Sequence, residues 1–229
     1  MHSRNQPLDR MSYEYGSPSC PIEETLTTVQ EWLTVVYRAE FLPAHRRSSR
    51  RTRRLRRIHG WNREIGRLVS GIDRVERETL PRIERDVGYT FQNPDGLFRI
   101  LMDGSTRRLF FGILEEFPED ALPLPAKDID ILGRFPDDAQ ALALIGDVTL
   151  RLKVLSGSHA GVPGIVPLSD RWRLHEHKLS LLCRHHPTGR ALEREKETLA
   201  GAVLGLLYVE GGIDPLRAAV PLLMSGGPA

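Results

Sequence analysis

The most apolar segment of the chain reads Thr198-Leu-Ala-Gly-Ala-Val-Leu-Gly-Leu-Leu-Tyr-Val-Glu-Gly-Gly212. Its apolar run from Leu199 to Val209 is about half of the roughly 20 residues that a membrane span needs, so the segment predicts a buried core helix. Gly211 and Gly212 are expected to end this helix, because glycine accepts the positive φ often found there. A second apolar segment, Gln140-Ala-Leu-Ala-Leu-Ile-Gly-Asp-Val-Thr-Leu150, predicts another core helix.

The whole chain reads as helical stretches separated by loops that contain proline and glycine, without the sustained alternation typical of strands. The expected helices run over residues 22–42, 58–80, 97–102, 108–117, 139–155, 170–185, 193–210 and 214–224. Longer loops are expected at 118–136 and 156–167, and Ser169 is expected to cap the helix that follows it. The sequence therefore predicts an all-α fold, with a tail at 1–20, a helical extension at 21–82 and a main domain at 83–229.

The chain has 229 residues, of which 40% are hydrophobic, so it is long enough for one domain of ordinary size and an extension. Its formal net charge is only +2, so the chain as a whole is not basic. Cys20 and Cys183 are the only cysteines, which supports neither a disulfide framework nor a zinc site and is typical of a reducing compartment. Because no secretory signal or membrane-spanning run is visible, we expect a cytoplasmic protein without a membrane partner.

The positive charge is concentrated in a basic segment, residues 45–57, which reads His45-Arg-Arg-Ser-Ser-Arg-Arg-Thr-Arg-Arg-Leu-Arg-Arg57. Arginine presents a rigid fork of donors that fits phosphate oxygens, so the basic segment predicts a contact with nucleic acid. A solvated surface, a nuclear-import signal and a contact with an anionic membrane are the alternatives. The candidate RNA-binding residues are Arg46, Arg47, Arg50, Arg51, Arg53, Arg54, Arg56 and Arg57.

An amphipathic helix is expected directly after the basic segment. Apolar residues from Ile58 to Leu80 recur at steps of three and four residues, and arginines and glutamates occupy the opposite face. This apolar stripe would pack either on the rest of the chain or on a protein partner. Packing within the chain is the favoured interpretation.

The order of these pieces resembles a ribonuclease III domain. The resemblance begins at Val87-Gly-Tyr-Thr-Phe-Gln-Asn-Pro-Asp-Gly-Leu97, which is similar to the Gly-Tyr-x-Phe turn and the following helix of that family. Ala141-Leu-Ala-Leu-Ile-Gly-Asp147 is similar to the family signature Leu-Glu-Phe-Leu-Gly-Asp. Leu168-Ser-Asp170 and Leu179 resemble parts of the next helix.

The clearest part of the resemblance is Ala202-Val-Leu-Gly-Leu-Leu-Tyr-Val-Glu-Gly-Gly212. It aligns without a gap to the family's Ala-Leu-Ile-Gly-Ala-Ile-Tyr-Leu-Asp-Gly-Gly. The resemblance covers residues 83–224 and implies a ribonuclease III-like helical domain. In that arrangement Gly205 is expected at a crowded helix contact, where a missing side chain allows close approach.

The acid positions of that family are mostly lost. Family enzymes place a Glu four residues before the aspartate of Gly-Asp, where this chain has Ala143. They place an Asp and a Glu, three residues apart, on the later helix, where this chain has Thr198 and Gly201. At the position of the upstream acid of the signature this chain has Gln140. Two-metal hydrolysis needs several carboxylates on facing helices. We therefore expect no cofactor, and Asp147 is a catalytic remnant and the one position that could still contact a metal.

The resemblance, taken with the lost acids, implies an RNA-binding relative of the nuclease family that acts in RNA processing or a ribonucleoprotein. It also implies a homodimer that binds double-stranded RNA by shape and backbone contact. We expect the family's usual C-terminal double-stranded RNA-binding domain to be absent and the basic segment to supply the affinity that this domain would give. One alternative is an active Mg²⁺-dependent endoribonuclease with displaced acids, taken from Asp137, Asp138, Glu195 and Glu197. The other is a protein-interaction scaffold.

Four further residues could be functional, but a structural or surface role is favoured for each. His175 and His177 would point about 200° apart on a helix, so they cannot chelate one metal ion from the same face. Both are expected at the surface, where a histidine such as His177 or His185 meets phosphate only when it is protonated. Trp172 lies between two arginines, and a core anchor is favoured over a base-stacking platform.

Overall fold

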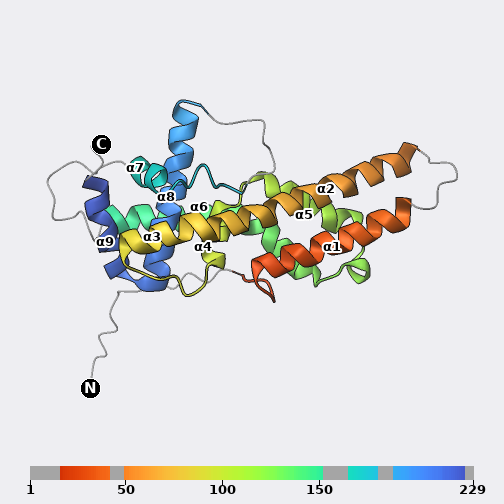
Figure 1. The fold of residues 1–229 in the computed structure, drawn as a ribbon, viewed down its shortest axis with the longest axis horizontal. Coiled ribbons are helices and arrows are strands. Elements are labelled where there is room, and N and C mark those ends of the chain that lie inside the picture. Colours follow the sequence, from red (N-terminus) through yellow and green to blue (C-terminus); the bar gives the residue numbers. More distant parts are fainter. Residues whose placement is uncertain (1–15, 42–48, 152–164, 180–187, 225–229) are drawn as a thin grey trace, which may run out of the picture.

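The computed structural model describes residues 16–41, 49–151, 165–179 and 188–224 (Figure 1). All regular elements in these ranges are helices, and their only extended pairing is an isolated parallel bridge between Met102 and Leu179. The prediction of an all-α fold is therefore confirmed for the described residues. None of the described helices combines the length and the apolar character needed to cross a membrane.

The first two helices pack side by side along the molecule (Figure 1). α1 (Ile22–Phe41) begins directly after Pro21 with two glutamates in its first turn, where the helix dipole favours negative charge. α2 (Ser49–Arg74) is tied to α1 by Asn62, whose Nδ2 donates a 2.5 Å hydrogen bond to Thr34 Oγ1. The buried stripe of α2 consists of Leu55, Ile58, Trp61, Ile65, Leu68 and Ile72. The expectation that this stripe packs within the chain is confirmed.

The helix that contains this stripe is longer than predicted. It begins at Ser49 rather than near Ile58, so the described part of the basic segment is helical. It continues through a π-helical turn, η1 (Val75–Thr79), into α3 (Leu80–Val87), which ends at Gly88 with a φ of 62°. The π turn lies directly ahead of Pro81, whose ring and missing N–H disfavour a regular α-helical turn.

Two helices that meet at glycines form the centre of the fold. α6 (Ala126–Thr149) and α8 (Arg190–Gly211) make the most extensive helix contact among the described elements. A Cβ atom on Gly146 would lie 2.1 Å from the carbonyl O of Gly201, and one on Gly205 would lie 2.0 Å from that of Leu142. The two backbones therefore touch, and the expected role of Gly205 is confirmed. α8 ends at Gly212 with a φ of 78°, as its glycine pair predicts.

The predicted loop at 118–136 is wrong over its second half. Only a short 3₁₀ turn, η2 (Glu119–Ala121), precedes α6, which begins at Ala126 and runs straight through Pro136. A proline inside a helix costs about 3 kcal/mol. Here the buried side chains of Ile129, Leu132 and Phe135 offset that cost, because burying each contributes about 1.5–3 kcal/mol.

The predicted helix at 170–185 is also wrong over residues 172–179. α7 (Val166–Arg171) is short and contains Ser169, which is buried inside the helix rather than capping it. Turns follow, with Arg173 at a φ of 54°, and the chain then extends towards Leu179. Leu179 N donates to Leu101 O at 2.8 Å and Asp103 N donates to Leu179 O at 3.0 Å, so this pairing replaces helical hydrogen bonds.

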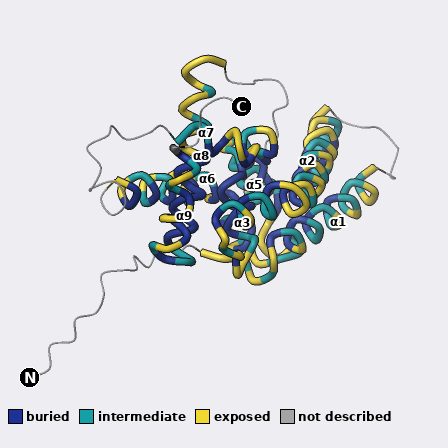
Figure 2. The backbone as a smooth tube through the Cα atoms, turned by 60° about the vertical axis from the view of Figure 1, so that its left-hand side comes forward, coloured by how far each residue is buried: buried dark blue, intermediate teal, exposed yellow. Residues whose placement is uncertain are grey.

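Three further helices, α4 (Asp95–Leu101), α5 (Ser105–Glu116) and α9 (Ile213–Met224), complete the described fold. One hydrophobic cluster contains side chains from all the described α-helices, and Figure 2 shows buried residues along the central helices. The proposed boundary at residue 82 lies inside α3, with core side chains on both sides of it. The division into extension and main domain stays a prediction.

Glu210 is a half-buried acid at the end of α8, and it makes stability depend on pH. Burial raises its pKa to about 7, although the N–H of Gln92 donates to it, and its Oε2 has no hydrogen-bond partner among the described residues. Because the folded pKa is raised, the acid contributes fully to stability below pH 4.5, and this contribution is lost as pH rises through about 7.

Replacement of Glu210 by glutamine should remove this loss. The free energy of unfolding of Glu210→Gln minus that of the wild type should rise by about 1–2 kcal/mol between pH 5 and pH 8. This rise is smaller than the full pKa shift implies, because solvent screens the site. Urea unfolding at the two pH values measures the change. Glu197→Gln, at an exposed position of the same helix, is the control and should show no such trend. Parallel behaviour of the two variants would contradict the argument.

Candidate nucleic-acid interface

The basic segment enters the described structure at the start of α2. Arg46 and Arg47 lie outside the described residues, and the other six candidate arginines occupy the first turns of the helix. These six divide into two groups according to what their guanidinium groups contact. The inner group is Arg51, Arg54 and Arg57, and the outer group is Arg50, Arg53 and Arg56.

The inner arginines hold α2 against its neighbours. Arg51 donates to the backbone O of Glu40 at 2.5 Å, and Arg54 lies 3.3 Å from the carboxylate of Glu40. Arg54 and Arg57 both reach the carboxylate of Glu116 at the end of α5, at 2.8 and 2.7 Å. Because Arg54 and Arg57 are already paired with acids of the chain, the inner group ties α1, α2 and α5 together and offers less charge to a ligand.

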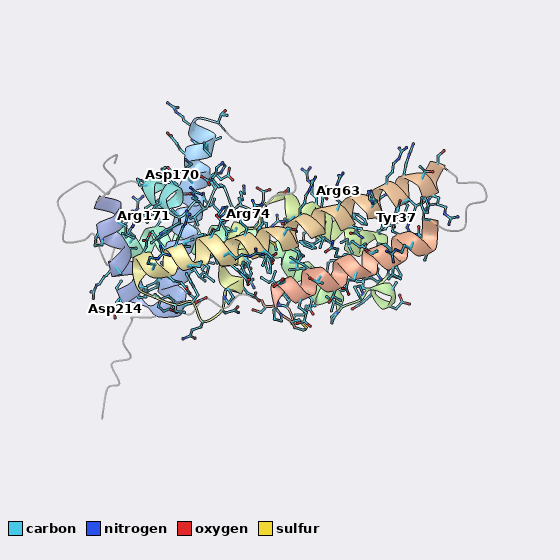
Figure 3. The ribbon with its side chains drawn as sticks, viewed as in Figure 1. Tyr37, Arg63, Arg74, Asp170, Arg171 and Asp214 are labelled. Carbon is cyan, nitrogen blue, oxygen red and sulfur yellow. The ribbon has the colours of Figure 1, made fainter. Side chains whose placement is uncertain are left out.

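Arg53 and Arg56 of the outer group begin a row of arginines that continues along α2. Its members are exposed, and none lies within 4 Å of a carboxylate in the described part of the chain. Steps of three, seven, four and seven residues keep the row opposite the buried stripe over about 30 Å, at 1.5 Å per residue. We call this row the arginine face, and it consists of Arg53, Arg56, Arg63, Arg67 and Arg74. Arg63 and Arg74 can be followed along α2 in Figure 3.

Three members of the arginine face were not among the candidate RNA-binding residues. In the sequence, Arg63, Arg67 and Arg74 read only as the polar side of an amphipathic helix. Arg63 follows Arg56 by seven residues, Arg67 follows four residues later, and Arg74 follows after seven more. This spacing identifies them as members of one helix face. A run of consecutive arginines indicates a high density of charge. A ligand, however, contacts only those charges that lie on one face of the helix.

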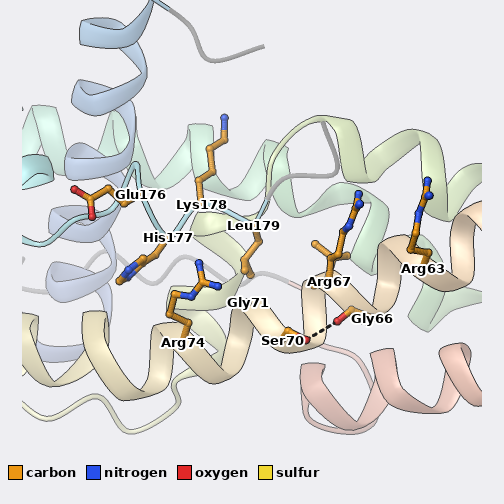
Figure 4. Close-up of a pocket in the computed structure, with 11 residues that line it drawn as sticks. Arg63, Gly66, Arg67, Ser70, Gly71, Arg74, Glu176, His177, Lys178 and Leu179 are labelled. Carbon is orange, nitrogen blue, oxygen red and sulfur yellow. Dashed lines mark hydrogen bonds between the residues drawn. The ribbon is translucent and has the colours of Figure 1, made fainter. Parts of the chain in front are cut away.

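A pocket of about 500 Å³ opens beside the arginine face, between α2 and residues 176–179 (Figure 4). Arg63, Arg67 and Arg74 line it from α2, and Figure 4 shows their side chains pointing away from α1. The remaining α2 residues of the pocket are mostly small: Gly66, Leu68, Ser70 and Gly71.

Lys178 belongs to the opposite wall, but its charge is used inside the chain. Its Nζ is paired with the carboxylates of both Asp103 and Glu195. Burial alone would lower the pKa of Lys178, and the hydrogen bonds to these two acids outweigh it, so the pKa lies above its ordinary value. The ammonium group therefore fixes the wall of the pocket rather than serving as a free cation.

His177 and Trp172 are structural residues, and for Trp172 this was the favoured interpretation. His177 is only 7% exposed, its Nδ1 lies 2.6 Å from Thr79 Oγ1, and burial lowers its pKa, which disfavours the protonated form that would meet phosphate. The prediction of a surface position for His177 is wrong, and His185 lies outside the described residues. Trp172 is fully buried, and its Nε1 donates to Asp86 at 3.0 Å, so it is a core anchor.

The five positions compared with the family's acids lie on α6 and α8. A Cβ atom on Gly201 would lie 3.3 Å from the carbonyl O of Ala143, so these two positions are neighbours across the helix contact. Asp147 accepts a 2.7 Å hydrogen bond from Arg151 Nε one turn on, where the helical backbone continues for two residues past the end of α6. Thr198 donates to the backbone O of its own helix at 2.9 Å, and Gln140 is exposed. Asp147 is thus an acid paired within its own helix.

Three of the four acids considered as replacements pair with basic side chains, and the fourth, Glu197, is exposed on α8. Asp138 accepts a 2.5 Å hydrogen bond from buried Arg99, Asp137 pairs with Arg107, and Glu195 pairs with Lys178. Over residues 16–41, 49–151, 165–179 and 188–224, no group of three or more His, Cys, Asp or Glu side chains is placed to hold a metal ion. In this part of the chain the geometry offers arginine donors for an anion rather than a carboxylate cluster for Mg²⁺.

No family model, no curated protein and no solved structure matches this chain. The resemblance to ribonuclease III therefore rests on the motifs quoted above.

Proposed function

We propose that this protein binds RNA through the arginine face and does not cleave it. The observation that carries the proposal is the row of exposed arginines on one side of α2, none of them within 4 Å of a described carboxylate. Guanidinium groups with no internal partner are the usual donors to phosphate oxygens, and phosphate contacts supply most sequence-independent affinity. The length of the row, about 30 Å, suits several phosphates along one duplex.

The likeness to ribonuclease III supports double-stranded RNA as the ligand and a homodimer as the binding unit. In that family the RNA duplex is held by shape and backbone contact, which requires no reading of bases. One feature of α6 favours a second copy: Leu144 is 65% exposed and Val148, one turn on, is 37% exposed.

Light scattering should give the mass of two chains, and a monomer mass at all concentrations would contradict this part of the proposal.

Removal of charges from the arginine face should weaken RNA binding. For Arg56→Gln/Arg63→Gln/Arg67→Gln we expect at least a roughly tenfold loss of affinity for a short RNA duplex. The logarithmic slope of affinity against salt concentration should fall by roughly 0.7–0.9 for each phosphate that the variant no longer neutralises. Fluorescence anisotropy at several salt concentrations measures both quantities.

A matched control removes the same charge from other surfaces. Arg134→Gln/Arg190→Gln/Arg217→Gln changes three exposed arginines on α6, α8 and α9. It should leave the affinity within about twofold of the wild type, because long-range charge effects are screened by salt. Equal losses in the two triple variants would contradict a defined interface. Short duplex products after incubation of the wild type with Mg²⁺ would contradict the absence of cleavage.

A further inference from the structure

The pocket beside the arginine face carries an excess of positive charge. Arg63, Arg67 and Arg74 line it, and none of them has a carboxylate within 4 Å among the described residues. Glu176 is the only acid in the described lining, and it lies 3.6 Å from Arg173, so part of its charge is already balanced. The charge that remains suits an anion that carries close to two negative charges.

The wall opposite α2 is held in place without using the arginines. Leu179 pairs with the backbone of Leu101 and Asp103, and Lys178 is bound to two carboxylates behind the wall. His177 contacts Thr79. A site whose walls are fixed by other contacts is pre-organised, so a ligand loses little affinity to ordering of the protein.

The floor of the pocket is partly apolar. Gly66, Ser70 and Gly71 line it from α2, and Ser70 is exposed and donates its Oγ hydrogen to Gly66 O at 3.0 Å. Leu179 forms an apolar side and packs so closely that a Cβ on Gly71 would lie 2.4 Å from its Cδ2. A volume of about 500 Å³ lies in the ordinary range of small-molecule sites and cannot admit a duplex.

From these features we propose that the pocket binds one nucleotide by its terminal phosphate monoester. The phosphate lies between Arg67 and Arg74, and the nucleoside rests against Ser70 and Leu179. A phosphate monoester carries about −1.5 to −2 charges at pH 7 and three acceptor oxygens, whereas the phosphodiester of a continuous strand carries one charge. The surplus of guanidinium groups and the limited volume therefore both favour a chain end or a free nucleotide over an internal stretch of strand.

This monoester has two sources, the 5′ end of an RNA strand and a free mononucleotide, and the first rests on the proposed RNA binding. Two single-stranded RNAs of the same sequence, one with a 5′-phosphate and one with a 5′-hydroxyl, separate end recognition from backbone binding. Both are labelled at the 3′ end for anisotropy. Adenosine 5′-monophosphate, with adenosine as its comparison, is titrated by calorimetry and tests the pocket without RNA.

We expect the wild type to bind the 5′-phosphorylated RNA about tenfold more tightly than its 5′-hydroxyl counterpart, or adenosine 5′-monophosphate more tightly than adenosine, or both. Arg67→Gln/Arg74→Gln should abolish either preference. Arg53→Gln/Arg56→Gln removes the same charge from the same helix outside the pocket, and should weaken both RNAs equally while keeping the preference. All four positions are exposed, so circular dichroism should be unchanged.

The outcomes separate the two proposals. A monoester preference lost only in Arg67→Gln/Arg74→Gln supports the pocket, and binding of the mononucleotide without any RNA binding would support the pocket while overturning the proposed function. RNA binding through the arginine face with no monoester preference, and no binding of adenosine 5′-monophosphate, would overturn the pocket alone. A preference that survives in Arg67→Gln/Arg74→Gln would also overturn it.

Discussion

Alanine at Gly205 should destabilise the protein by about 3 kcal/mol or more, although alanine is the better helix former. The added Cβ would lie 2.0 Å from the carbonyl O of Leu142, a backbone atom that can move only if α6 and α8 separate. Overpacking of a core by one methyl group costs about 1–3 kcal/mol when side chains can adjust. Here the obstacle is backbone on both sides, so the cost is at or above that range.

Three glycines form a graded series for this test. A Cβ added to Gly60 on α2 would have no atom within 4 Å, so Gly60→Ala should stabilise by about 0.5–1 kcal/mol through helix propensity. Gly201→Ala would place its Cβ 3.3 Å from Ala143 O and should have a small or intermediate effect. Urea unfolding followed by circular dichroism ranks the variants. If Gly205→Ala is no less stable than Gly60→Ala, the backbone contact between α6 and α8 is not present.

The core helices could be predicted because their apolar residues recur at helical steps and their ends carry distinct signals. Gly212 ends α8 with the expected positive φ, and α1 starts at the residue after Pro21. Pro136 misled the prediction, because a local rule about proline does not include the energy of burying Ile129 and Leu132. The segment after α7 failed for a related reason, since its backbone pairs with Leu101, far away in the sequence.

The candidate site could be predicted only in part. The density of arginines in the basic segment pointed to an anion, but the sequence does not show that Arg54 and Arg57 would meet Glu116 at the end of another helix. The pocket depends on residues 176–179 lying on α2, a contact between segments about a hundred residues apart. Such a contact follows from packing of the whole chain, and no local pattern encodes it.

Replacement of Lys178 by methionine should destabilise the protein by about 3 kcal/mol at neutral pH. Its ammonium group holds Asp103 and Glu195 together, and side-chain exposures of 21%, 23% and 18% leave all three groups partly buried. Removal of the cation leaves two carboxylates that repel one another in a poorly solvated place, and breaking such a pair costs about 3–5 kcal/mol when burial is complete. Thermal or urea unfolding measures the loss.

The pH dependence distinguishes this cause from a loss of packing. In the wild type, burial would raise the pKa of Asp103, but hydrogen bonds from Lys178 and the N–H of Ser105 outweigh it and hold the pKa below its ordinary 3.8. The stability that this carboxylate contributes is therefore present above pH 3.8 and is lost as pH falls through the lower folded value. The difference between the wild type and Lys178→Met should accordingly shrink in acid, where the carboxylates are protonated in both proteins.

Two further variants test whether Lys178 stabilises the protein through its charge. Arg134→Met breaks an exposed pair with Asp130, 2.7 Å long, and should change stability by no more than about 0.5 kcal/mol. Lys178→Met/Asp103→Asn should be more stable than Lys178→Met alone, because one of the two unpaired charges is gone. If Lys178→Met loses no more stability than Arg134→Met, or if adding Asp103→Asn restores no stability, Lys178 does not hold the wall of the pocket by charge. If both results are as expected, the wall that faces Arg67 and Arg74 is fixed by an ion cluster separate from the proposed ligand site.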